Sequence, residues 1–234
     1  MNKYKKVLLK LSGEALAGGN GKGFSEKTVL EVGRQVKYLI ESGIQVGVVI
    51  GGGNFWRGRS SESMDRTKAD QIGMLATVMN CLYTSEIFRS VGLRTKVMTP
   101  FTIGTMTTEF TKDDCMKRQA KGEVIFFAGG IGHPFFSTDT AAALRAIETE
   151  CDIILLAKNI DGVYDSDPNI NKDATKFDKI SLKEVIDKDL KVMDLTSAIM
   201  CLEHEMPMSV FYLNEENSIV NAVNDKANGT VVYV

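Results

Sequence analysis

Glycine-rich and polar segments follow short apolar runs at four places in this sequence, and their residue types suit phosphate groups. The first is Lys10-Leu11-Ser12-Gly13, at the end of the run that begins at Lys6. A lysine in a buried strand is stabilised when its ammonium group reaches an anion, although a lysine at the rim of a sheet can also extend to water. Gly13 lets the backbone approach a ligand closely. Lys10 is therefore a candidate phosphate contact, with a rim lysine as the alternative.

The second segment is the triple glycine Gly51-Gly52-Gly53, which follows the run Gln45–Ile50 and precedes a helical segment. Consecutive glycines there present backbone N–H groups at a helix N-terminus, whose partial positive charge favours phosphate. Arg57 lies one turn further on and supplies a planar fork of donors. A tight turn needs one glycine, or at most two, so three glycines indicate an anion site.

The third segment begins at Gly129 after another apolar run and ends at Asp139. Ser137 and Thr138 suit the cap of a following helix, with their hydroxyl groups toward a phosphate. Asp139 beside them suits the ordering of a magnesium ion or of a lysine. His133 is a candidate general base, but a histidine in a loop is more often a hydrogen-bonding residue.

The fourth segment contains two turn signals, Asp161-Gly162 and Asp167-Pro168. Tyr164 lies between the turns, where it suits covering an adenine ring. A partly buried surface tyrosine is an equally compatible interpretation of this residue.

Two familiar nucleotide motifs are excluded. Gly21-Lys22-Gly23 lacks the Ser or Thr that follows the lysine of a P-loop. Gly130-Ile131-Gly132 is followed by Phe135, where a dinucleotide fingerprint requires a small residue. The Gly18–Gly23 segment is instead predicted to be a mobile loop, with simple chain slack as the alternative.

The elements that position these segments are predicted from the alternation of apolar runs with helical periods. Continuous apolar runs are typical of parallel strands covered by helices on both faces. The expected strands are Lys6–Leu11, Gln45–Ile50, Arg94–Met98, Val124–Ala128, Ile153–Ala157, Ser209–Leu213 and Thr230–Val234. The expected helices are Ser25–Glu41, Thr67–Arg89, Thr138–Thr149, Ser181–Lys188, Thr196–Glu205 and Asn217–Asn224. This order predicts an α/β fold, a three-layer α/β/α sandwich with a doubly wound, mainly parallel central sheet. Ligands of such sheets bind at the carboxyl ends of the strands, which is where all four segments lie.

Length, charge and cysteine usage limit the class of protein. A chain of 234 residues without a linker of biased composition predicts a single domain over residues 1–234. A net charge of −2 provides no global positive field for nucleic acid or for anionic lipid. The four cysteines have no CxxC spacing, and no apolar run suits a signal peptide or a membrane span. We therefore expect a cytoplasmic protein with neither nucleic acid nor a membrane as a partner.

Several motifs together resemble those of the amino acid kinase family. They are Lys10-Leu11-Ser12-Gly13-Glu14, Ile50-Gly51-Gly52-Gly53-Asn54 with Arg57-Gly58, and Asp161-Gly162-Val163-Tyr164 with Asp167-Pro168. Three more motifs are similar to those of the bacterial uridylate kinase branch of that family: Met74 to Asn80, Pro134 to Asp139, and Lys191 to Leu195. The resemblance extends over nearly the whole chain, and the motifs occur in the family's order.

This resemblance implies an activity, a cofactor and partners. The activity is reversible transfer of the γ-phosphate of ATP to UMP, which gives UDP and ADP in pyrimidine nucleotide biosynthesis. The cofactor is Mg²⁺ bound with ATP, and no direct protein ligand of the metal is predicted. The resemblance also implies activation by GTP, inhibition by UTP and a homo-oligomer, a hexamer in this family.

The resemblance further implies roles for individual residues. The implied catalytic positions are Lys10, Arg57, Asp139 and Asp194. The implied ATP positions are Lys10, Leu11, Ser12, Gly13, Gly53, Arg57, Lys158, Asn159, Tyr164 and Asp167, with Lys158 and Asn159 as alternatives on the adenine side. The implied UMP positions are Gly52, Asp70, Ile131, Gly132, His133, Pro134, Phe135, Phe136, Ser137 and Thr138. The segment implied in the response to GTP is Gly18, Gly19, Asn20, Gly21, Lys22 and Gly23. Ile131 and His133 replace the threonine and asparagine that are usual in the family, which leaves uracil to be recognised by backbone donors.

Two other functions are compatible with such a fold. One is a kinase that acts on a carboxylate or a carbamate, and the other is a protein that binds nucleotide without turnover. The combination of Lys10, Asp139 and Asp194 favours catalysis, because a passive binder does not need all three. The phosphate oxygen of UMP is already ionised, so the transfer requires no general base, and this argues against a catalytic role for His133.

Overall fold

The computed structural model describes residues 3–18, 21–56 and 64–234. Its central feature is a nine-stranded sheet in the order β4-β3-β5-β2-β1-β6-β10-β11-β9. Every pairing in the sheet is parallel except that of β10 with β11. The strands are β1 (Lys6–Leu11), β2 (Gln45–Ile50), β3 (Arg94–Thr99), β4 (Thr108–Glu109), β5 (Glu123–Phe127), β6 (Ile153–Lys158), β9 (Lys179–Ser181), β10 (Met208–Tyr212) and β11 (Gly229–Tyr233).

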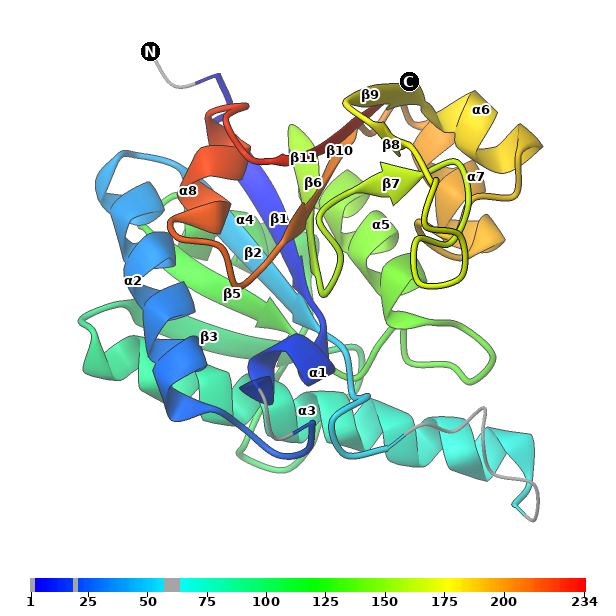
Figure 1. Ribbon diagram of the computed structural model, residues 1–234. Coiled ribbons are helices and arrows are strands. Elements are labelled where there is room, and N and C mark those ends of the chain that lie inside the picture. The colour runs from blue at the N-terminus through cyan, green and yellow to red at the C-terminus, as the bar shows by residue number, and fades with distance from the viewer. Residues whose placement is uncertain (1–2, 19–20, 57–63) are drawn as a thin grey trace.

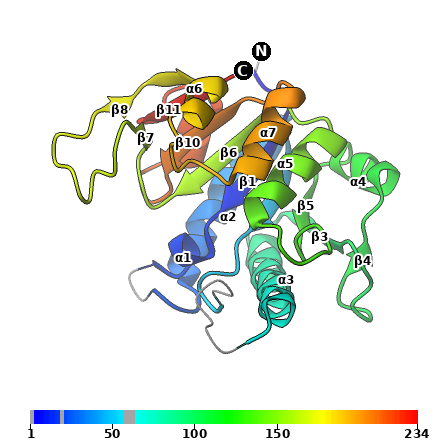
Figure 2. The same ribbon diagram turned by 90° about the vertical axis from the view of Figure 1, so that its right-hand side faces the viewer.

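Helices cover both faces of this sheet, as Figures 1 and 2 show. The helices are α1 (Gly13–Leu16), α2 (Glu26–Glu41), α3 (Arg66–Ser90), α4 (Lys112–Gln119), α5 (Thr138–Glu148), α6 (Leu182–Asp187), α7 (Leu195–Glu203) and α8 (Ser218–Val223). One apolar core lies between the sheet and α1, α2, α3 and α8, and a second lies between the sheet and α4, α5, α6 and α7. The predicted three-layer α/β/α sandwich is thus confirmed.

The side chains of strand β1 enter both apolar cores, which explains why its sequence is an apolar run. Val7 and Leu9 point into the first core, whereas Leu8 points into the second. Alternate side chains of a strand leave opposite faces of the sheet, so a central strand between two helical layers needs an unbroken apolar run. Lys10 interrupts that run at the carboxyl end, where the sheet meets the loops.

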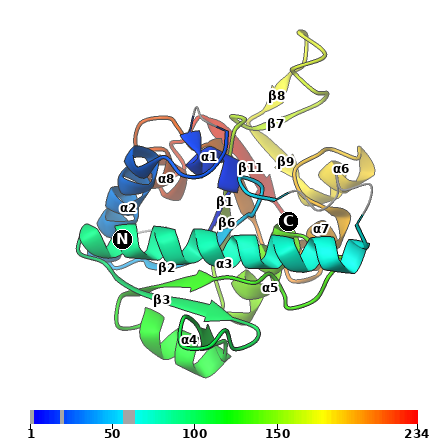
Figure 3. The same ribbon diagram turned by 90° about the horizontal axis from the view of Figure 1, so that it is seen from below.

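Local signals placed the helix boundaries well. Ser25 is the N-cap of α2, since its hydroxyl oxygen accepts a hydrogen bond from the backbone N–H of Thr28. Ser181 and Glu184 form a capping box at the start of α6. The sequence analysis did not anticipate α1, α4, β4 and β9, nor the hairpin of β7 (Val163–Tyr164) and β8 (Lys176–Phe177), which projects from the body of the molecule in Figure 3.

The carboxyl ends of β1, β2, β5 and β6 lie side by side, because these four strands are neighbours in the sheet. The chain continues from β1 toward α2 on one face, and from β6 toward α6 and α7 on the other. A point at which neighbouring strands continue to opposite faces is where open α/β sheets bind ligands. None of the described helices combines the length and apolarity that crossing a membrane requires.

Candidate active site

An ion pair joins two of the predicted catalytic residues at the carboxyl end of β1. Nζ of Lys10 lies 2.6 Å from Oδ1 of Asp139, and the two side chains are 11% and 18% exposed. Asp139 reaches this position because α5 begins at Thr138, directly beyond the third glycine segment. The side chain of Lys10 is thus mostly buried and has an anionic partner, which disfavours the rim-lysine alternative.

Lys158 brings a second cation to the same place from the end of β6. Its ammonium group donates a hydrogen bond to the backbone carbonyl oxygen of Val192. Burial lowers the pKa of Lys158, the charge of Asp139 opposes that shift, and the charge of Lys10 adds to it. Asp139 therefore pairs with Lys10 and also lies within electrostatic reach of Lys158.

Asp194 fastens α7 to α5. It is the N-cap of α7, where Oδ1 accepts the backbone N–H of Ser197 at 3.0 Å. Its carboxylate also accepts the hydroxyl of Ser137 and, at 3.2 Å, that of Thr140. Ser137 caps α5 as predicted, with Oγ accepting the N–H of Asp139 at 2.9 Å. The Ser137 hydroxyl hydrogen is thus directed to a protein carboxylate, and not to a ligand as expected.

The triple glycine corrects the sequence analysis. It was expected to open a helix, but the N–H groups of Phe55 and Trp56 both bond to the carbonyl oxygen of Gly52 in a turn. Helix α3 begins only at Arg66, with Asp65 as its N-cap. The three glycines suggested the start of a helix, but the same pattern is compatible with an isolated turn. The backbone donors of this loop are therefore those of a turn.

Gly13 and the triple glycine are in close contact. A Cβ atom on Gly13 would lie 2.3 Å from the carbonyl oxygen of Gly51 and 2.5 Å from Oδ1 of Asn54. The loops after β1 and β2 therefore approach each other as only a glycine permits. This contact brings the two predicted phosphate-binding loops together.

A cavity of about 620 Å³ lies between the end of β1 and the β7–β8 hairpin. Most of the predicted ATP residues line it, namely Lys10, Ser12, Lys158, Asn159, Tyr164 and Asp167. The hydroxyl of Tyr164 donates to Oδ1 of Asp161 at 2.8 Å, and this hydrogen bond raises the pKa of Tyr164. Tyr164 is therefore held in the cavity wall. Lys158 and Asn159 both line this cavity, so both alternatives stay open.

A second, smaller cavity of about 130 Å³ lies between α3 and the third glycine segment. Six predicted UMP residues line it, namely Gly52, Asp70, His133, Phe136, Ser137 and Thr138. Oδ2 of Asp70 accepts the backbone N–H of Phe135 at 2.8 Å, and both carboxylate oxygens accept Nε–H of Arg66. Phe135 has a φ of +73°, a conformation that is unusual for a residue other than glycine. Asp70 therefore anchors a strained turn beside the cavity.

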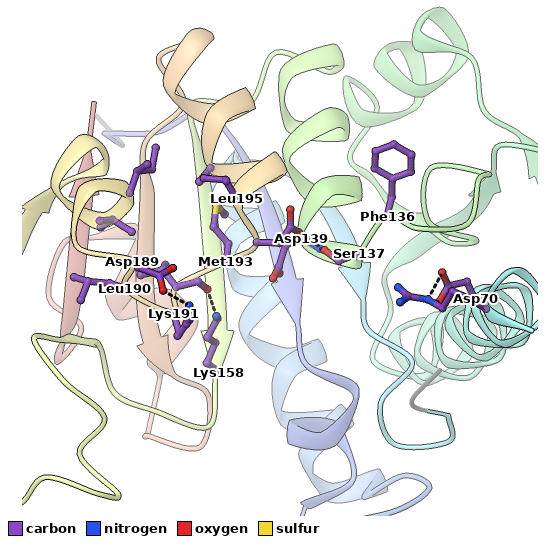
Figure 4. Close-up of a pocket in the computed structure, with 16 residues that line it drawn as sticks. Asp70, Phe136, Ser137, Asp139, Lys158, Asp189, Leu190, Lys191, Met193 and Leu195 are labelled. Carbon is purple, nitrogen blue, oxygen red and sulfur yellow. Dashed lines mark hydrogen bonds and ion pairs between the residues drawn. The ribbon is translucent and has the colours of Figure 1, made fainter. Parts of the chain in front are cut away.

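A third cavity, of about 710 Å³, adjoins both. It shares Asp70 with the smaller cavity, and it shares Lys158 and the loop that includes Lys191 with the first. Figure 4 shows Asp139 between Lys158 on one side and Asp70 on the other. The Lys10–Asp139 pair therefore lies where the spaces expected for the two nucleotides meet.

Some predicted residues lie away from these cavities or outside the described part of the chain. Leu11 is buried in the first core, so only its backbone can face a ligand. Ile131, Gly132, Pro134 and Phe135 do not line the three cavities. Gly18, Gly21, Lys22 and Gly53 line a fourth cavity, of about 490 Å³, together with Glu14. Arg57, Gly19 and Asn20 lie outside the described residues.

Two residues that line the smaller cavity were not predicted, Trp56 in the loop after β2 and Thr77 in α3. Trp56 lines the smaller cavity, and its indole Nε1–H donates to the carbonyl oxygen of Ala69 at 2.8 Å. Thr77, which also lines this cavity, accepts the backbone N–H of Gly129 with its hydroxyl oxygen. A lone tryptophan after three glycines is a signal that could have indicated Trp56. Thr77 lies inside the Met74 to Asn80 motif, which could have indicated it, although a threonine inside a long helix is ordinary by itself.

The described residues contain no group of three or more His, Cys, Asp or Glu side chains arranged to hold a metal ion. All four cysteines are buried and free. Burial raises the pKa of Cys151 to about 11 and that of Cys201 to about 12. These thiols are therefore protonated near neutral pH and contribute to packing.

Comparison with known proteins agrees with this geometry. The family model of the amino acid kinase family matches residues 5–212. The structure is similar to that of the UMP kinase from Bacillus anthracis, with a TM-score of 0.94 and 33% sequence identity over 98% of this chain and 96% of that one. It is also similar to the UMP kinase from Ureaplasma parvum, with a TM-score of 0.93 and 33% identity over 99% of this chain and all of that one. The uridylate kinase from Archaeoglobus fulgidus is more distant, with a TM-score of 0.73 and 25% identity over 99% and 100% of the two chains. Matches of this extent, together with the paired loops at the carboxyl ends of β1 and β2, show that the chain belongs to the amino acid kinase family.

Proposed function

We propose that this protein is a UMP kinase, which transfers the γ-phosphate of ATP to UMP and releases UDP and ADP. The observation that carries the proposal is the Lys10–Asp139 ion pair: Lys10 lines the cavity beside Tyr164, and Asp139 lines the third cavity, which adjoins both that cavity and the one beside Asp70. The resemblance of the whole chain to two UMP kinases supports the choice of acceptor.

In this proposal ATP occupies the cavity of about 620 Å³ beside Tyr164, and UMP occupies the cavity of about 130 Å³ beside Asp70. Phosphoryl transfer depends mainly on positioning and on stabilisation of charge. Lys10 supplies an ammonium group at the meeting point of the phosphates, and Asp139 holds that group in place. Lys158 adds positive charge from β6, and the positive end of the α5 dipole lies toward the acceptor phosphate, although the N–H groups of Asp139 and Thr140 bind the hydroxyl oxygen of Ser137. Asp194 acts as a positioning residue, because it fixes the start of α5 through Ser137.

We further infer that Mg²⁺ arrives with ATP. Carboxylate oxygens are the protein ligands that Mg²⁺ prefers, and it usually retains waters and phosphate ligands. Asp139, which lies close to Lys10 and Lys158, is the residue that would bind the water ligands of the Mg²⁺ ion. When bound, magnesium neutralises negative charge on the phosphates. Arg57, as a further phosphate contact, belongs to the same proposal.

Turnover with a panel of acceptors tests the function. ADP release from ATP is measured with UMP, with other nucleoside monophosphates, and with carboxylate acceptors such as aspartate and acetylglutamate. We expect rapid release of ADP when UMP is the acceptor, and with none of the other acceptors. Release with a carboxylate but not with UMP supports a carboxylate kinase, and binding of ATP without release under any condition supports a passive nucleotide binder.

Asp70→Asn is expected to raise the KM for UMP about tenfold, because it removes a charged hydrogen-bond acceptor at the smaller cavity. The KM for ATP should stay within twofold of its original value. Initial rates with each nucleotide varied in turn measure both constants. Glu86→Gln, in an exposed ion pair with Arg89 on the same helix, serves as a matched control with unchanged constants. An equal rise in both KM values would contradict the placement of UMP.

Regulation, assembly and location complete the proposal. We propose one domain over residues 1–234 in the cytoplasm, activated by GTP through the Gly18–Gly23 segment and inhibited by UTP. Exposed apolar side chains on α3, including Leu75 and Met79, support a homo-oligomer, which we propose is a hexamer. The same turnover measurement with added GTP or UTP tests the effectors, and light scattering measures the assembly.

A further inference from the structure

Two buried asparagine side chains, Asn54 after β2 and Asn80 in α3, contact each other between the glycine-rich segments. They are 3% and 0% exposed. Nδ2 of Asn80 donates to Oδ1 of Asn54 at 2.7 Å, and Nδ2 of Asn54 donates to Oδ1 of Asn80 at 3.1 Å. The two amides therefore form a reciprocal pair in the interior.

The remaining hydrogens of both amides bind backbone carbonyl groups of two different glycine segments. Asn80 donates to the carbonyl oxygen of Gly51 at 2.7 Å, and Asn54 donates to that of Gly23 at 2.8 Å. All four amide hydrogens thus have acceptors. Neither amide can be turned over, because its oxygen would then face a carbonyl oxygen. The pair has one arrangement, and that arrangement fixes Gly23 relative to Gly51.

The loop after β1, which contains Gly13, also packs against this pair. Gly13 lies so close to Asn54 and to the Gly51 carbonyl group that a methyl group there has no space. The loop after β1 therefore packs against Asn54. Three segments that are distant in sequence meet at two side chains.

Helix α3 extends this arrangement to the acceptor side. Thr77 lies one turn before Asn80, and its hydroxyl oxygen accepts the backbone N–H of Gly129 at 2.8 Å. Asp70, two further turns before, accepts the N–H of Phe135. The helix therefore serves as a common support for the donor-side and acceptor-side loops.

Burying two amides costs free energy that an apolar pair would not, so a fully satisfied polar pair selects one geometry more than it adds stability. We propose that Asn54 and Asn80 are positioning residues for phosphoryl transfer: they hold the loops after β1 and β2 and residues 21–23 in the alignment that the reaction requires. This inference rests on the proposed function, because it concerns how the phosphates of ATP and UMP are aligned. Neither amide needs to touch a nucleotide.

The proposal separates kcat from KM. Asn80→Ala and Asn54→Ala each lower kcat about 10²-fold, the size expected when reacting groups are displaced by about 1 Å. The KM values for ATP and UMP change less than about threefold, because the walls that contact the nucleosides remain. The double variant has nearly the kcat of the worse single variant, since both substitutions remove the same pair.

Ser85→Ala is the matched control. Ser85 is a buried residue of α3 that hydrogen-bonds Thr95 at 2.8 Å, away from the glycine segments. Ser85→Ala lowers the melting temperature about as much as Asn54→Ala and Asn80→Ala do, but it leaves kcat unchanged. A kcat within twofold of the original in folded Asn80→Ala, or losses that multiply in the double variant, would overturn the proposal.

Hydrogen exchange measured by mass spectrometry provides a readout without turnover. Deuterium uptake over residues 21–25 rises in Asn54→Ala and Asn80→Ala and stays unchanged in Ser85→Ala. Unchanged uptake in all three variants contradicts the pair's role. Asn54 lies in a turn, so its variant tests the pair even if the α3 substitution prevents folding. Absence of UMP phosphorylation by the original protein overturns the proposed function alone, because the exchange measurement still tests the pair.

Discussion

Lys10→Ala is expected to lower kcat about 10²-fold, the loss typical of removing one preorganised electrostatic contact. The KM for UMP should change little, because in the proposed arrangement UMP binds beside Asp70 at the smaller cavity, away from Lys10. The substitution also removes one of the two positive charges near the carboxylate of Asp139. The net charge beside the phosphates then becomes more negative, which adds to the loss.

A second buried lysine on the same strand provides the control for this experiment. Lys6 lies at the amino end of β1, where its ammonium group donates to the carbonyl oxygen of Thr149 at 2.8 Å. Lys6→Met should lower the melting temperature while kcat remains unchanged. Steady-state rates and thermal unfolding of both variants separate loss of a buried charge from loss of catalysis. Near-normal turnover in Lys10→Ala would exclude Lys10 from the reaction.

Gly13→Ala is expected to reduce kcat/KM by about 10²-fold, although the change adds only one methyl group. Gly13 is the first residue of α1, a conformation that alanine accepts readily. The effect therefore comes from space: the new methyl group would lie 2.3 Å from the backbone carbonyl oxygen of Gly51, which cannot rotate away as a side chain can. The loops after β1 and β2 must separate, and the phosphates they hold lose their alignment.

Gly33→Ala in α2 is the appropriate comparison. Its added Cβ meets a ring carbon of Phe88 at 3.1 Å, and a side chain can shift by a few tenths of an ångström. We expect kcat/KM to remain unchanged in this variant. Initial-rate measurements at several ATP and UMP concentrations measure the difference. Equal rates in Gly13→Ala and the original protein would show that the two loops need not touch.

Elements with strong local signals could be predicted from the sequence. The run Gln45–Ile50 forms β2 with the expected ends, because unbroken apolar residues suit only a strand covered on both sides. Helix α4 (Lys112–Gln119) was missed because it is short and mostly polar, so it has almost no apolar periodicity. Its start was marked by Thr111, which caps it, and by Asp113 and Asp114 in its first turn.

The candidate site could be predicted in its residue types but not in its pairings. Lys10 and Asp139 were both expected near phosphates, yet nothing in the sequence paired them, because they are far apart along the chain. The Asn54–Asn80 contact is of the same kind. Such contacts arise from the packing of α3 and α5 against the sheet, and tertiary packing has no local signature.

The central position of β1 also has a consequence for how the chain reaches this structure. Its partners are β2 on one side and β6 on the other, where Val7 lies opposite Ile153. Bringing Val7 and Ile153 together closes a long loop, and the entropy that this costs is lost before the new contacts stabilise the structure. Sheets whose neighbouring strands are distant in sequence therefore fold slowly. Lys10 meets Asp139 only after β6 has joined β1 and α5 has packed over both. The proposed catalytic centre is therefore among the last features to form, and a chain still emerging from the ribosome passes through most of its synthesis without this centre.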